Sequence, residues 1–96
     1  MRGFEVQLNG KKICTAGIDR AGILNATVDI VWRKPKAEYA MHLRVGGLQG
    51  DDHQRWAAKD LEIGDEITIR IIEAKSIDTP APVRPPRLDR SGKMKL

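Results

Sequence analysis

The sequence predicts an all-β fold: a small antiparallel sandwich or partly open barrel of five to six strands with a disordered C-terminal tail. Three observations predict it. Apolar and polar residues alternate over residues 4–8, 23–33, 39–45 and 67–71, which is the period of a strand with one buried face. Asn-Gly and Gly-Asp pairs separate strand-like segments, as turns require. Four of the five prolines lie beyond residue 76, where few apolar residues remain.

The length of 96 residues allows one domain, which we place at residues 1–76, followed by a Pro-rich, basic, flexible tail at residues 77–96. The domain carries 12 basic and 11 acidic residues and the tail carries 5 and 2, so the basic character lies in the tail. A nearly neutral domain argues against a basic nucleic-acid-binding face. The single cysteine excludes an internal disulfide framework, and we find neither a secretory signal nor an apolar run long enough for a membrane helix. We therefore expect a cytoplasmic protein without membrane contact.

The first hairpin is predicted by Asn9-Gly10, because both central residues of a type I′ turn need φ > 0. A regular ladder from this turn pairs Leu8 with Lys11, Gln7 with Lys12, Val6 with Ile13, Glu5 with Cys14 and Phe4 with Thr15. Cys14 then faces away from the core beside Glu5. That neighbour disfavours the thiolate, so we interpret Cys14 as a partly covered strand cysteine and not as a nucleophile.

The second hairpin joins residues 23–33 to residues 39–45. Pro35 cannot donate to a central ladder, so the first strand is expected to stop before it. With a loop at 35–38, the opposed pairs are Trp32 with Met41, Ile30 with Leu43, Val28 with Val45 and Asp29 with Arg44. Five residues then share the inward face: Leu24, Ala26, Val28, Ile30 and Trp32. Trp32 is accordingly expected in the core, and His42 on the polar face.

Residues 46–53 are the most turn-like stretch of the domain, because three glycines and two aspartates disfavour a regular element. We expect a short strand at 54–57 and a helical turn at 58–61. The strongest strand follows a Gly64-Asp65 turn, and its three isoleucines, Ile67, Ile69 and Ile71, are expected to face the interior.

No catalytic residue, metal-ligand set or cofactor site follows from the sequence. The spacings that specify zinc sites are absent, and the glycine-rich stretch lacks the lysine and the helix of a phosphate loop. A long glycine-rich loop on a rigid scaffold often carries function. The candidate binding residues are therefore Gly46, Gly47, Gly50, Asp51, Asp52, His53, Arg55 and Trp56.

Trp56 beside Arg55 has two interpretations. It can cap the open end of a small core, which we favour, or it can act as an interface anchor or a stacking platform for a base. In the tail, Pro82-Val-Arg-Pro85 matches the PxxP pattern of polyproline II ligands, but the match is short and common, so we favour a plain disordered tail.

Three motifs occur together: Asn-Gly-Lys-Lys-Ile-Cys-Thr-Ala-Gly at 9–17, Val-Gly-Gly-Leu-Gln-Gly at 45–50 followed by Arg55-Trp56, and Leu-Glu-Ile-Gly-Asp-Glu-Ile-Thr-Ile-Arg at 61–70. This combination resembles a group of small uncharacterised bacterial all-β proteins, over Phe4 to about Ser76. The resemblance implies no activity, cofactor or site residue.

Three functional hypotheses follow. The first is a non-enzymatic protein-interaction module with an unidentified protein partner. The alternative is a single-stranded nucleic-acid or anion binder that uses Arg55, Trp56 and weak contacts of the basic tail. The third is a metal-dependent hydrolase that uses Asp51, Asp52 and His53. A homodimer through edge strands is a further expectation, since a sheet this small exposes its edges.

Overall fold

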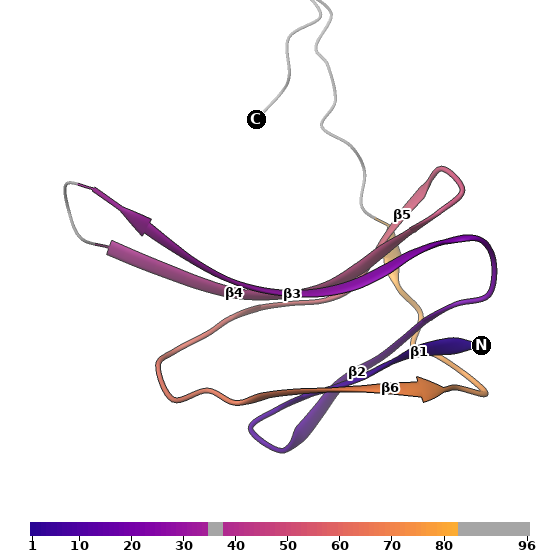
Figure 1. The fold of residues 1–96 in the computed structure, drawn as a ribbon, viewed down its shortest axis with the longest axis horizontal. Coiled ribbons are helices and arrows are strands. Elements are labelled where there is room, and N and C mark those ends of the chain that lie inside the picture. Colours follow the sequence, from indigo (N-terminus) through magenta and orange to yellow (C-terminus); the bar gives the residue numbers. More distant parts are fainter. Residues whose placement is uncertain (35–37, 83–96) are drawn as a thin grey trace, which may run out of the picture.

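The computed structural model describes residues 1–34 and 38–82, and these residues form two antiparallel sheets without a helix (Figure 1). One sheet has the strand order β2-β1-β6 and the other has the order β3-β4-β5-β7. The strands are β1 (Arg2–Leu8), β2 (Lys11–Ile18), β3 (Gly22–Arg33), β4 (Glu38–Gln49), β5 (Asp52–Asp60), β6 (Ile67–Glu73) and β7 (Ala81–Pro82). The predicted all-β class is confirmed, in the form of an open sandwich.

The first hairpin has the predicted turn, with Asn9 at φ 52° and Gly10 at φ 81°. Beyond the second pair its register shifts, so that Val6 lies opposite Cys14. The extra residue is Ile13, as in a β-bulge, which places two residues of one strand against one of the other. The prediction that Cys14 faces outward is therefore wrong, because the bulge turns its side chain into the core.

The second hairpin keeps its predicted faces but has a different register. Arg33 lies opposite Glu38, so the return strand begins one residue earlier than expected. The observed pairs are Trp32 with Tyr39, Ile30 with Met41, Asp29 with His42 and Val28 with Leu43. Each pairing differs from the prediction by two residues, and a shift of two leaves every side chain on its original face.

The stretch 46–53, predicted as a loop, is a strand hairpin. β4 continues through Gly46 and Gly47 to Gln49, the turn is Gly50-Asp51, and β5 begins at Asp52. The two glycines permit close approach between strands. A Cβ on Gly47 would lie 2.5 Å from the Ile23 carbonyl oxygen, and one on Gly46 would lie 2.8 Å from that of Gln54.

The short strand predicted at 54–57 is the middle of β5, which continues to Asp60. The helical turn predicted at 58–61 is therefore wrong. After β5 the chain remains attached to β4, because the Leu61 amide donates to the Met41 carbonyl at 2.8 Å. Leu61 is thereby fixed with its side chain in the core.

The core is small and lies where β2 faces β4 and β5. Its buried members are Val6, Cys14, Ala16, Leu43, Val45 and Leu61. Around them pack the partly buried residues Phe4, Leu8, Ile13, Leu24, Ala26, Met41, Trp56, Ala57 and Ile67.

The interior predicted around β6 is not closed. Ile67 packs against the core, but Ile69 is exposed and the Ile71 side chain is 78% exposed. The cause is the position of β6, which pairs with β1 at the outer side of its sheet, whereas β2 makes the main contacts with the other sheet. Figure 1 shows the two layers diverging away from their shared corner near β2.

Residues 77–82 also belong with the sheets, although the sequence places the domain boundary at Ser76. The Asp78 amide donates to the Thr15 carbonyl at 2.9 Å, and the Asp78 carboxylate accepts from the Thr15 amide at 2.8 Å. β7 then pairs with Gln54 and Arg55 of β5. The remainder of the predicted disordered tail, residues 83–96 with most of the PxxP motif, lies outside the described residues.

Candidate functional site

A two-stranded ribbon projects from the upper sheet in Figure 1. It consists of residues 30–33 of β3 and 38–41 of β4, because the pairing of β4 with β5 ends at His42 and Asp60. Beyond that point β4 has only β3 as a strand partner, although the Leu61 amide still donates to the Met41 carbonyl. The ribbon is therefore the part of this sheet that β5 does not flank.

The ribbon exposes large apolar side chains. Ile30 is 65% exposed, Trp32 is 52% exposed and Tyr39 is 62% exposed. The prediction that Trp32 and Ile30 lie in the core is therefore wrong, because the opposite sheet does not extend beneath them. The Trp32 and Tyr39 rings stack with centroids 6.0 Å apart, and the Lys34 ammonium lies 4.9 Å from the Trp32 ring centroid. These contacts fix the two rings without covering them.

The free edge of β3 continues from the ribbon. β3 is the terminal strand of its sheet and pairs only with β4, over all twelve residues. Its backbone amides and carbonyls on the other side have no strand partner among the described residues. Val28 and Ile23 add two more exposed apolar side chains along this edge.

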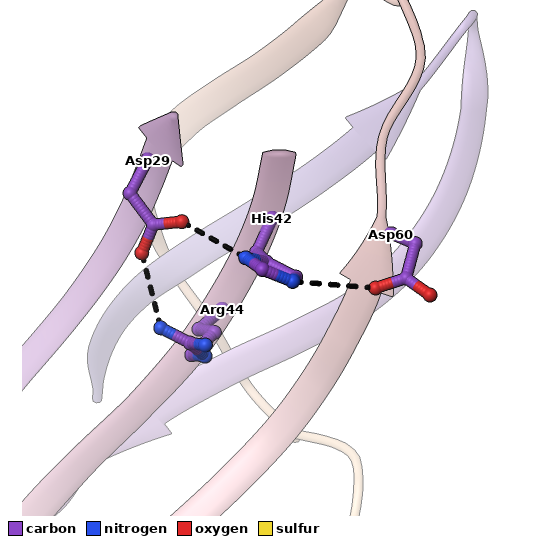
Figure 2. Close-up of polar contacts among 4 residues, drawn as sticks. All are labelled: Asp29, His42, Arg44 and Asp60. Atoms are coloured by element: carbon purple, nitrogen blue, oxygen red, sulfur yellow. Dashed lines mark hydrogen bonds and ion pairs between the residues drawn. The ribbon is translucent and has the colours of Figure 1, made fainter. Parts of the chain in front are cut away.

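A polar cluster occupies the outer face of the same sheet (Figure 2). His42 lies between two carboxylates: its Nδ1 is 3.1 Å from Asp29 Oδ1 and its Nε2 is 3.6 Å from Asp60 Oδ1. Arg44 Nη1 donates to Asp29 Oδ2 at 3.0 Å. The predicted attraction between Asp29 and Arg44 thus forms as a diagonal contact and not between directly opposed residues.

This cluster resembles the orienting half of a catalytic triad, in which a carboxylate positions a histidine. The other ring nitrogen faces Asp60, however, and not a hydroxyl that it could activate. The arrangement is that of polar contacts spanning three strands, among which Arg44 and Asp29 form an ion pair. A partly exposed pair such as Arg44 with Asp29 contributes about 0.2–1 kcal/mol to stability.

An open basin of about 380 Å³ lies beside this cluster on the outer face. Gly46 forms part of its lining, between Asn25 of β3 and Arg55 of β5, where it adds no side chain. The lining residues are Ile23, Asn25, Arg44, Val45, Gly46, Gly47, Leu48, His53, Gln54 and Arg55. Two guanidinium groups, two side-chain amides and an imidazole therefore border one hollow, a set of donors suited to an anion.

The structure brings four of the eight predicted binding residues to this basin: Gly46, Gly47, His53 and Arg55. The other four lie elsewhere. Gly50 and Asp51 form the exposed hairpin turn, and Asp52 forms an ion pair with Arg20 at 3.1 Å. Trp56 packs against the core, and its Nε1 donates to the Asp78 carbonyl at 2.8 Å.

Two of the sequence hypotheses are affected by this geometry. Trp56 points to the core side and Arg55 to the outer basin, so they do not form a single stacking platform. The favoured role of Trp56 as a residue that closes the core agrees with its packing. Asp52 pairs with Arg20, whereas His53 lines the basin, and the described residues contain no group of three metal-ligating side chains.

Sequence reasoning missed the exposure of Ile30, Trp32 and Tyr39 and the contribution of Asn25 and Arg44 to the basin. One signal was present in the sequence: the strand pattern at 23–33 is longer than any other, so part of this strand extends beyond the strands that could cover it.

The described residues contain no helix that is long and apolar enough to cross a membrane. In comparisons with known proteins, no family model, no curated protein and no solved structure matches this chain.

Proposed function

We propose that the protein is a non-enzymatic interaction module that binds a protein partner through the ribbon and the free edge of β3. The observation that carries this proposal is the exposure of Ile30, Trp32 and Tyr39 next to an unpaired strand edge. Exposed apolar clusters on small domains mark interaction surfaces more often than isolated apolar residues do.

The chemistry of the surface supports strand addition as the binding mode. An added strand gains main-chain hydrogen bonds from the edge, and alternate side chains of the sheet supply specificity. Trp32 and Tyr39 are held in place by their mutual stacking, so they lose little side-chain entropy when a partner covers them. A cytoplasmic location remains a prediction from the single cysteine.

The test compares two isoleucines that receive the same substitution. Ile30→Ser changes the ribbon, whereas Ile63→Ser changes the loop between β5 and β6, where Ile63 is 94% exposed. We expect Ile30→Ser and Trp32→Ala to lose the proteins that the immobilised wild-type chain captures, and Ile63→Ser to keep them. Thermal unfolding of each variant establishes that it is folded. Capture by Ile30→Ser and Trp32→Ala at the wild-type level would refute the proposal.

A second candidate function is anion or single-stranded nucleic-acid binding, which the basin favours. Arg55 and Arg44 offer fork-shaped donors to phosphate, although Arg44 also bonds Asp29. We would titrate a labelled single-stranded oligonucleotide at two salt concentrations against the wild-type chain, Arg55→Ala and the control Arg70→Ala, which alters exposed β6. Weaker binding in Arg55→Ala alone supports this candidate, and equal binding by all three chains removes it.

A further inference from the structure

The free edge of β3 is suited to a second copy of the same strand. We propose that two chains associate through antiparallel pairing of β3 with β3, centred on Thr27, which joins the two four-stranded sheets into one continuous sheet. This inference rests on the proposed function, because it names the occupant of the same edge.

β3 is the longest uncovered edge in the described chain. The edge of β5 is partly covered by β7, and the edge of β2 is bonded in both directions between Thr15 and Asp78. The edge of β6 is seven residues long, whereas that of β3 has twelve. Long, apolar, uncovered edges are the ones that pair with other chains unless charges or prolines block them.

The charges of β3 do not block its edge. Asp29 is held toward β4, where it contacts both His42 and Arg44. The other charged residue of the strand is Arg33, at its end. The eleven residues from Gly22 to Trp32 therefore contain one charge, and that charge is neutralised within the chain.

The sequence of β3 is self-complementary about Thr27. In an antiparallel pair, opposed residues share a face, so a two-fold axis at Thr27 matches each residue with one on the same face. On the outer face the axis pairs Thr27 with Thr27, Asn25 with Asp29 and Ile23 with Val31. On the inner face it pairs Ala26 with Val28, Leu24 with Ile30 and Gly22 with Trp32. Every pair is polar with polar or apolar with apolar, or sets the Trp32 ring over a glycine.

Neighbouring registers lack this match. An axis at Asp29 would oppose two carboxylates, which is destabilising. An axis at Val28 would place Arg33 against Ile23 and Val31 against Asn25. An axis at Val31 keeps the match but leaves only residues 29–33 in overlap. The Thr27 axis is therefore the register that uses nearly the whole edge, and it covers Ile23, Val28 and Ile30, which are exposed in the single chain.

Symmetric cross-linking tests the register. Directly opposed antiparallel residues have Cα atoms about 4.5–5.5 Å apart, within the roughly 4.4–6.8 Å that a disulfide spans. We expect Thr27→Cys to oxidise to a disulfide-linked dimer. Thr68→Cys, the same substitution on the β6 edge, and the wild-type chain with its 2%-exposed Cys14 should not.

Mixing two different cysteine variants tests the register without relying on Thr27. Asn25→Cys and Asp29→Cys are expected to cross-link with each other when mixed, and not when each is oxidised alone. Preferential cross-linking of Val28→Cys or of Asp29→Cys alone would overturn the proposed register.

Charge exchange at the axis tests the association itself. Light scattering of the wild-type chain should give twice the 10.7 kDa chain mass. In Thr27→Glu or Thr27→Lys, two like charges meet on the axis, and we expect the dissociation constant to rise about fivefold. A mixture of the two variants should recover the dimer, because opposite charges then face each other.

The outcomes separate this inference from the proposed function. A monomeric wild-type mass, with no more cross-linking in Thr27→Cys than in Thr68→Cys, overturns the dimer. If Ile30→Ser and Trp32→Ala still lose other captured proteins in that case, the interaction module stands with a different occupant at the edge. If they lose none, both proposals fail.

Discussion

Cys14 lies directly opposite Val6 on the inner face of the first hairpin, and both side chains are shielded from solvent. Burial raises the pKa of the Cys14 thiol, and the nearby Asp78 carboxylate raises it further. A buried, protonated thiol is a poor nucleophile. We therefore expect alkylation of Cys14 to be much slower in the native chain than in denaturant, as followed by mass spectrometry. Equal rates in both conditions would contradict the buried position.

The raised pKa of Cys14 also predicts a loss of stability at alkaline pH. The unfolded chain loses its thiol proton near the ordinary value of 9.0, before the folded chain does. The stability from the protonated thiol is therefore fully present below that pH and is lost as pH rises through the folded pKa. Chemical unfolding at pH 7 and at alkaline pH should show this decrease in the wild-type chain and a smaller one in Cys14→Ala.

Asn9 and Asp65 join the first turn to the loop before β6. Asn9 Nδ2 donates to Asp65 Oδ1 at 2.9 Å, and the Glu62 amide donates to Asp65 Oδ2 at 2.7 Å. These bonds lower the pKa of the Asp65 carboxyl, chiefly the one from Asn9. The stability from this carboxylate is present above its ordinary pKa of 3.8 and is lost as pH falls through the folded value.

We expect acidification below pH 3.8 to lower the thermal midpoint of the wild-type chain more steeply than the midpoint of Asp65→Asn. The control is Asp51→Asn, because Asp51 lies in the exposed β4–β5 turn. The same acid dependence in wild type and Asp65→Asn would show that this carboxylate makes no contribution.

Gly47 sits where β3 and β4 approach closely. A methyl group there would meet the Ile23 carbonyl oxygen, so either the strands separate or the sheet distorts. Gly47→Ala should lower the free energy of unfolding by about 1–3 kcal/mol, the usual cost of overpacking. Gly50→Asn serves as the control, because Gly50 has open space around it and φ 59°, a conformation that asparagine tolerates. Denaturant unfolding of both variants measures the difference.

Trp56 joins the core to the segment after β6. Trp56→Phe keeps most of the packing but removes the donor to the Asp78 carbonyl. We expect a loss of about 1 kcal/mol in the free energy of unfolding, as for one hydrogen bond. Trp56→Ala should cost more, because it also removes packing against the core. Unchanged stability in Trp56→Ala would indicate a binding role for Trp56 instead.

Alternation of side chains was sufficient to predict the fold class and the strands at 4–8, 23–33, 39–45 and 67–71, because it reports directly on which face of a strand is buried. It was insufficient for Cys14, since a bulge at Ile13 leaves no mark in the pattern. It also failed at Gly46-Gly47, where the glycines reflect the distance between backbones and not a turn.

Alternation also assigned Trp32 and Ile71 to the interior, although both are exposed. A pattern identifies the inward face of a strand, but the area of the opposing sheet decides how much of that face is covered. Half of the candidate site residues line the basin. His53 and Arg55 are two residues apart on β5, and Gly46 and Gly47 lie beside them on β4. Arg44 and Asn25 also line the basin, but the sequence did not indicate them. Their positions beside it depend on the register between the strands.

The pairing of β1 with β6 has a consequence for how the chain folds. β3, β4 and β5 are strands that follow one another closely in the sequence and pair in that order, so this meander can form from local contacts as soon as it has been synthesised. β1 pairs with β6, with Phe4 opposite Ile71, so this pairing cannot form before β6 has been synthesised. Pairings between residues so far apart in the sequence form slowly. During translation the N-terminal hairpin therefore remains an unfinished sheet until almost all of the described chain has left the ribosome.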